Sequence, residues 1–164
     1  MPEDICPNCG RPIDAHNRHV RFRLPDPVLQ TPAQERTEGT WMTDPDPNKA
    51  VMIQVPGVGP FVRCLLPVKL TGGYTITFGV WMVVHPDDLQ RIARVWWEPE
   101  YSDLTFDCWL ANHIPVFGLL AAPAKAAVRD KDETPYLDQS SDPRMSELLT
   151  KAWPHEQILS AISA

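Results

Sequence analysis

The chain has 164 residues, 43% of them hydrophobic, so a single domain can bury its core without a metal or disulfides. Its formal net charge is −6, which argues against nucleic-acid binding because that function needs a basic surface to neutralise phosphates. Proline is abundant, at 18 residues, and this favours short elements and extended structure over long helices.

The first residues carry neither the basic region nor the apolar run of a secretory signal. No stretch of about 20 apolar residues follows that could span a membrane. Four cysteines in a chain without a signal indicate reduced thiols rather than a disulfide framework. We therefore expect a cytoplasmic protein.

Two cysteines near the start, Cys6 and Cys9, are separated by two residues and followed by a glycine, so a tight turn aims both sulfurs at one point. This spacing predicts a zinc-type knuckle over residues 1–24, with Cys6, Cys9, His16 and His19 as candidate ligands. The two histidines share a face only if their segment makes a helical turn; in a strand they point apart. A metal-free remnant is the alternative. A redox role fits less well, because such a motif normally precedes a helix and proline-rich chain follows here.

Residues 19–24 alternate polar and apolar side chains, which predicts a short half-buried strand. Residues 25–49 are rich in proline and aspartate and cannot sustain a long helix. We expect a surface excursion there, with one helical turn near residues 32–36.

Three strands joined by short glycine-containing turns are predicted next, at residues 51–55, 61–70 and 74–84. Turns this short favour an antiparallel meander. Pro67 interrupts the second strand, so we expect a bulge or a sheet edge at that point.

A helix is predicted to begin at Pro86, because proline fits the first turn and two aspartates follow at the positive end of the helix dipole. Its apolar residues, from Leu89 to Trp96, recur at helical spacing and form one face. Further along we expect a strand at 106–111, an extended segment or short helix at 116–122, a strand at 125–129, a loop at 130–143 and two helices at 143–153 and 156–162.

This order, with strands early and helices late, predicts an α+β fold. We expect an antiparallel sheet of about five strands with helices on one face, forming a domain over residues 25–164. The N-terminal CxxC knuckle, residues 1–24, precedes it.

Two further cysteines, Cys64 and Cys108, lie within apolar strand-like runs and are expected to be small buried core residues. His85 and His113 each end a strand-like run beside a turn, a position where functional sites collect. Either thiol paired with one of these histidines is a conceivable nucleophile. The sequence contains no glycine-rich phosphate loop, nucleophile elbow or zinc-protease motif.

Tryptophan is heavily used, with six in the chain. Trp81 and Trp96 are expected in the core between sheet and helix. Trp97 cannot share the helical face of its neighbour, so it is a candidate for an exposed aromatic that contacts a partner. Trp41, in the long excursion, is a second candidate binding residue.

Ordered landmarks along the chain resemble those of the bacterial family catalogued as domain of unknown function 2199. They are the start at Cys6 and Cys9, Leu24-Pro25 with the later residues 32–36, the strand 61–65, residues 78–81 before a helix ending at Trp96, residues 109–112, and the closing helix at Asp142-Pro143. The family pattern places a histidine four residues after the second cysteine, where this chain has Ile13. The resemblance implies a fold and a bacterial, cytoplasmic setting, and it supplies no activity.

We expect a non-enzymatic bacterial protein that binds another protein in an accessory or immunity-type role, with zinc in its knuckle. The alternative is a small enzyme or ligand-binding protein. Its site would lie near His85 and His113, with Trp97 or Trp41 lining the pocket.

Overall fold

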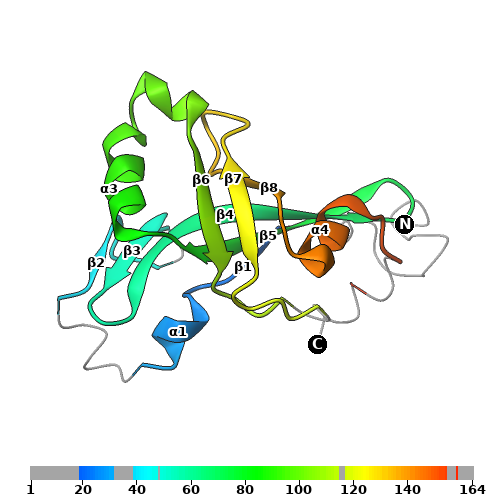
Figure 1. Ribbon diagram of the computed structural model, residues 1–164, viewed down its shortest axis with the longest axis horizontal. Coiled ribbons are helices and arrows are strands. Elements are labelled where there is room, and N and C mark those ends of the chain that lie inside the picture. Colours follow the sequence, from blue (N-terminus) through cyan, green and yellow to red (C-terminus); the bar gives the residue numbers. More distant parts are fainter. Residues whose placement is uncertain (1–18, 32–38, 48, 115–116, 155–157, 159–164) are drawn as a thin grey trace, which may run out of the picture.

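A computed structural model describes residues 19–31, 39–47, 49–114, 117–154 and 158. In this part of the chain strands dominate and the helices are short (Figure 1). The strands are β1 (His19–Arg21), β2 (Trp41–Met42), β3 (Met52–Val55), β4 (Gly59–Leu70), β5 (Tyr74–Val83), β6 (Thr105–Leu110), β7 (Pro123–Ala127) and β8 (Tyr136–Gln139). The helices are α1 (Asp26–Leu29), α3 (Pro86–Val95), the 3₁₀ helix η3 (Pro99–Asp103) and α4 (Pro143–Thr150).

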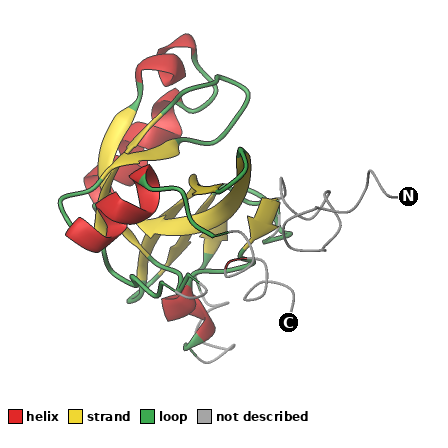
Figure 2. Ribbon diagram, turned by 90° about the vertical axis from the view of Figure 1, so that its right-hand side faces the viewer, coloured by secondary structure: helices red, strands yellow, loops and turns green. Residues whose placement is uncertain are grey.

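Five of the strands, β4 to β8, close into a barrel. β5 pairs with β4 on one side and β6 on the other, and the order continues through β7 to β8. β8 returns to β4 through a parallel pairing of Tyr136 with Leu65, and the Leu65 N–H donates to the Pro135 carbonyl at 2.8 Å. Figure 2 shows the strands curving instead of lying in one flat layer.

The predicted α+β fold, with helices on one face of an antiparallel sheet, is therefore wrong. The strand that closes the barrel, β8, lies in the stretch 130–143, for which the sequence predicts a loop. Only Leu137 of β8 is buried, so the segment lacks the apolar alternation that marks a strand. α3 lies near the beginning of β4 and α4 near its end, so the helices do not form one layer (Figure 1).

The strands predicted at 51–55, 61–70 and 74–84 are confirmed as an antiparallel meander, with ends displaced by one or two residues. The helix predicted from Pro86 and the strand near 106–111 are also present. No helix in the described ranges is long and apolar enough to cross a membrane.

Other predicted segments differ from the structure. Residues 117–122 form turns in which Leu119 and Ala121 have positive φ, so they are neither a strand nor a helix. The excursion contains a helical turn, α1, but at Asp26–Leu29; residues 32–36 lie outside the described part of the chain, as does most of the predicted helix 156–162.

Pro67 lies in an unbroken ladder, opposite Thr77 and without a bulge. The Leu65 N–H points toward β8, and the alternation of a strand directs the nitrogen of Pro67 toward the same edge, away from β5. The interruption expected at Pro67 is therefore absent: β4 has β5 on one side and β3 and β8 on the other, and the missing N–H breaks no bond between β4 and β5.

β4 and β5 are buried on both faces, which creates two cores. Val62 and Phe78 face the interior of the barrel and belong to its main apolar cluster. Phe61 and Trp81 face outward and pack in a second cluster with residues such as Leu24. We call this second cluster the outer core. It lies between the barrel wall and the segments around β1, α1 and β3, and β1 is held there by parallel pairing with β5.

Candidate functional site

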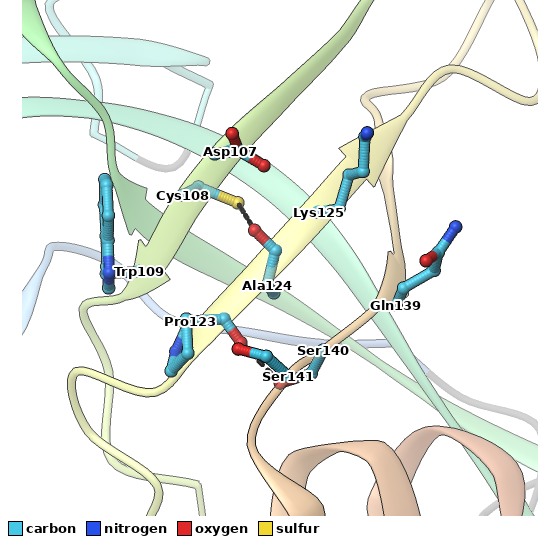
Figure 3. A pocket seen from close by; sticks show the side chains of 9 residues that line it. All are labelled: Asp107, Cys108, Trp109, Pro123, Ala124, Lys125, Gln139, Ser140 and Ser141. Carbon is cyan, nitrogen blue, oxygen red and sulfur yellow. Dashed lines mark hydrogen bonds between the residues drawn. The ribbon is translucent and has the colours of Figure 1, made fainter.

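A groove of about 460 Å³ lies on the outer face of β6, β7 and β8 (Figure 3). We call it the outer groove. Its lining residues come from all three strands and from the turn after β8: Asp107, Cys108, Trp109, Pro123, Ala124, Lys125, Gln139, Ser140 and Ser141.

The pleat of the three strands decides which side chains border the outer groove. β6 alternates strictly, so Asp107 and Trp109 face outward while its apolar residues fill the barrel. Asp107 is directly opposite Lys125, which is in turn opposite Gln139, so a polar row crosses three strands. Trp109 is 42% exposed and lies opposite Pro123, and both residues line the groove. The groove thus combines an exposed aromatic with hydrogen-bond donors and acceptors.

Two potential nucleophiles beside the groove, Cys108 and Ser140, are bound to backbone carbonyls. The Cys108 thiol is buried and donates to the Ala124 carbonyl at 3.4 Å, and the Ser140 hydroxyl donates to the Pro123 carbonyl at 2.5 Å (Figure 3). Burial raises the pKa of the Cys108 thiol to about 12, and the neighbouring Asp107 carboxylate adds to this shift. Since a thiolate is the reactive form of cysteine, these groups favour noncovalent binding over covalent catalysis.

A second feature is a fully buried arginine, Arg63, on the outward face of β4. Its Nε donates to the Ala50 carbonyl at 3.1 Å and its Nη2 to the Pro47 carbonyl at 3.0 Å. Its Nη1 donates to the carbonyls of Phe22, at 2.9 Å, and Gly79, at 3.1 Å. One guanidinium therefore links the segment after β1, the segment before β3 and the wall of the barrel.

The guanidinium of Arg63 also lies 4.2 Å from the ring centroid of Trp81, within the range of a cation–π interaction. Burial, together with the charge of Arg21, lowers the pKa of Arg63 to about 9, so the group stays protonated at neutral pH. The indole N–H of Trp81 donates to the Arg23 carbonyl at 3.3 Å, which adds another link to the same segment.

A fully buried asparagine, Asn112, follows β6. It binds the far end of the segment that follows β1. Its Oδ1 accepts from the Trp81 N–H at 2.8 Å, and its Nδ2 donates to the Leu24 carbonyl at 3.0 Å and to Asp26 Oδ1 at 3.1 Å. Asp26 Oδ2 accepts from the His113 N–H at 2.8 Å. We call Arg63, Trp81, Asn112 and Asp26 the buried network.

A sequence model of the family described as an uncharacterized protein conserved in bacteria (DUF2199) matches residues 5–148. The chain belongs to this family. No curated protein and no solved structure matches it.

The landmarks that carry the family resemblance converge in space. Arg63, Trp81 and Asn112 each come from a different landmark segment, and all three belong to the buried network. Leu24, from a fourth landmark, accepts the amide bond from Asn112. Within the described residues, these landmark residues therefore make contacts that hold separate segments of the fold together.

The predicted zinc ligands cannot be placed. Cys6, Cys9 and His16 lie outside the described residues, and only the backbone of His19 is described, as the first residue of β1. In the described ranges, no three His, Cys, Asp or Glu side chains come together in a group that could hold a metal. The zinc site and the boundary after residue 24 stay predictions.

The predicted thiol–histidine pairs are not brought together. Cys64 and Cys108 are buried in the core of the barrel, as expected, and burial raises the pKa of both thiols. His85 and His113 are exposed at the surface. His85 caps α3 instead, since its Nδ1 accepts from the Asp87 N–H at 3.2 Å.

The predicted exposure of two tryptophans is confirmed: Trp97 is 72% exposed and Trp41 is 45% exposed. Trp97 borders a shallow cleft of about 220 Å³ beside Tyr101 and residues 131–134. Trp81 is fully buried, as expected. Sequence reasoning did not select Trp109 as a site residue, although the alternation of residues 105–110 places it on the same face as two polar side chains.

Proposed function

We propose that this protein is a non-enzymatic binding module that holds a segment of another protein in the outer groove. The accessory or immunity-type role and the cytoplasmic setting expected from the sequence are part of this proposal. The observation that supports it is the exposed Trp109 beside an open groove, where the Ser140 hydroxyl and the buried Cys108 thiol are already bound to carbonyls. Trp97 and Trp41 are proposed as further contacts.

A protein segment suits the groove chemically. Tryptophan is enriched among the residues that dominate protein interfaces, because it supplies a large contact area with few rotatable bonds. The row of Asp107, Lys125 and Gln139 offers both acceptors and donors, and these match the polar groups of an extended peptide. In the described part of the chain, His85 and His113 are exposed while both described thiols are buried, so the enzyme alternative has less support.

Replacing Trp109 is expected to lower partner affinity about 30-fold, the effect of losing a hot-spot aromatic worth about 2 kcal/mol. The measurement is photocrosslinking in a bacterial host, with benzoylphenylalanine placed at Gln139 in the groove. We expect one discrete crosslinked partner when Trp109 is intact. The Trp109→Ala variant should give much less of this crosslinked product. The partner is then purified, and its affinity for both proteins is measured.

Two controls make this experiment decisive. The crosslinker at Gln90, exposed on α3, should not capture the same partner, and Trp97→Ala should reduce capture less than Trp109→Ala. Equal capture from Gln90, or capture unaffected by Trp109→Ala, would contradict the proposed use of the groove.

We also propose that Cys6 and Cys9 bind zinc, with His16 and His19 as the remaining ligands. The support is the spacing of the four residues, which suits a tetrahedral ion. Zinc thiolates are protected from disulfide reagents, while buried thiols with raised pKa values are protected whether or not metal is present.

Titration of the native protein with a chromogenic disulfide reagent at pH 8 separates these two kinds of cysteine. We expect no rapidly reacting thiol in protein purified with about one zinc per chain. Addition of a chelator should release Cys6 and Cys9 only, and denaturant should release Cys64 and Cys108 as well. Two reactive thiols before chelation would argue against the zinc site, and four would argue against the buried thiols.

A further inference from the structure

A second hollow, distinct from the outer groove, lies between α1 and the strands β2 and β3 and has a volume of about 330 Å³. We call it the α1 pocket. Its described lining residues are Arg23, Leu24, Val28, Thr40, Met42, Pro47 and Ile53. The volume is within the range of small-molecule sites, about 300–1,000 Å³.

The floor of the α1 pocket is apolar. Leu24, Val28 and Ile53 are buried members of the outer core, and half-buried Met42 packs against it. Such a surface gains free energy by burying an apolar ligand body, at roughly 25 cal/mol per Å².

One polar atom of the pocket is left unsatisfied. The Oγ1 of Thr40 is buried and has no hydrogen-bond partner in the part of the chain that the structure describes. A buried hydroxyl without a partner costs about 1–3 kcal/mol, so a native protein rarely keeps one without a reason. The hydroxyl is covered in the free protein, so it reaches a ligand oxygen only when the Thr40 side chain turns toward the hollow, and the bond then formed would remove the cost.

The buried network holds the two walls of this pocket. The wall formed by Arg23 and Leu24 is tied to the barrel through their carbonyls, which accept from Trp81 and Asn112. The opposite wall is held where the Pro47 carbonyl accepts from Arg63. The pocket is therefore preformed, and a ligand entering it need not first order its walls.

We propose that the α1 pocket binds a small amphipathic molecule with an apolar body and one anionic oxygen-bearing head, such as a carboxylate. The body lies on the apolar floor. The positive charge of exposed Arg23 at the pocket lining favours an anion over a neutral or cationic head. A head oxygen accepts from the Thr40 hydroxyl once that side chain has turned toward the hollow. This proposal uses other residues than the outer groove and does not depend on the proposed function.

The test uses anilinonaphthalene sulfonate, an aromatic anion whose fluorescence rises in apolar sites, and octanoate as a competitor. We expect saturable binding to the folded wild-type protein and displacement by octanoate. Met42→Trp, which fills the pocket, should abolish the binding, and Arg23→Gln should weaken octanoate about tenfold. Arg94→Gln removes the same charge from exposed α3 and should change nothing.

Thr40→Val supplies a readout that does not depend on ligand identity. Valine has nearly the same shape without the hydroxyl, so the variant should melt at a higher temperature than the wild type without ligand and bind octanoate several-fold more weakly. A lower melting temperature would show that the hydroxyl has a partner in the free protein and would overturn the proposal. Probe binding unaffected by Met42→Trp, or absent from the wild type, would also overturn it.

Discussion

Arg63→Met is expected to lower the free energy of unfolding by about 3–5 kcal/mol. The guanidinium donates to four backbone carbonyls, and these acceptors cannot be removed together with the side chain. Methionine fills a similar volume but donates to none of the four, and in the described part of the chain only the Gly79 carbonyl keeps another donor, the Phe22 N–H at 3.0 Å. A typical domain has only about 5–15 kcal/mol of stability, so the variant should be close to unfolding at moderate temperature.

Urea denaturation followed by tryptophan fluorescence measures this effect. Arg63→Lys keeps the charge but offers a compact ammonium instead of a planar fork, so it should recover less than half of the loss. Lys69→Met removes a cation from an exposed position of the same strand and should change stability by no more than about 0.5 kcal/mol. An Arg63→Met variant within about 1 kcal/mol of the wild type would show that the four bonds contribute little net stability.

Asn112→Asp is expected to lower the free energy of unfolding by about 3 kcal/mol, although it only replaces the side-chain NH2 group with an oxygen. The new carboxylate can still accept from the Trp81 N–H. It loses the donor to the Leu24 carbonyl and Asp26, and it places a buried carboxylate in contact with the half-buried one of Asp26. Equilibrium unfolding in urea at neutral pH measures the loss.

The double variant Asp26→Asn with Asn112→Asp is the matched control. It restores one donor and one acceptor between positions 26 and 112 and removes the repulsion between two carboxylates. Its free energy of unfolding should therefore be at least about 1 kcal/mol higher than that of Asn112→Asp alone. The His113 N–H keeps an acceptor in this variant, because asparagine retains one side-chain oxygen. No recovery would mean that the cost of Asn112→Asp arises outside this pair.

Local patterns were sufficient for the elements with a clear period. β5 is a long run of β-branched and aromatic residues, β4 is largely apolar and bounded by glycine-containing turns, and α3 begins with proline and two acidic residues, so both kinds of element are found where the sequence predicts them. The exposure of Trp97 was predicted from its place beside Trp96, although α3 ends at Val95 and Trp97 lies in the turn that follows. The ordered landmarks likewise predicted the family to which the chain belongs.

The candidate sites depend on contacts between distant segments, and no local pattern reports those. Arg63 is one arginine in an apolar strand, and only the fold shows that its partners come from residues 22, 47, 50 and 79. The outer groove depends on the register of β6, β7 and β8, which sets Trp109 opposite Pro123. The α1 pocket likewise forms only where α1 meets β2 and β3.

The sequence by itself therefore determined the meander, the main helix, the buried thiols and the family. Tertiary structure alone decided that the sheet closes, because closure depends on β8, a polar segment with a single buried side chain that becomes a strand only by pairing with β7 and β4. The physical reason is that hydrophobic periodicity records which face of an element is buried. It does not record which backbone will supply its hydrogen-bond partners.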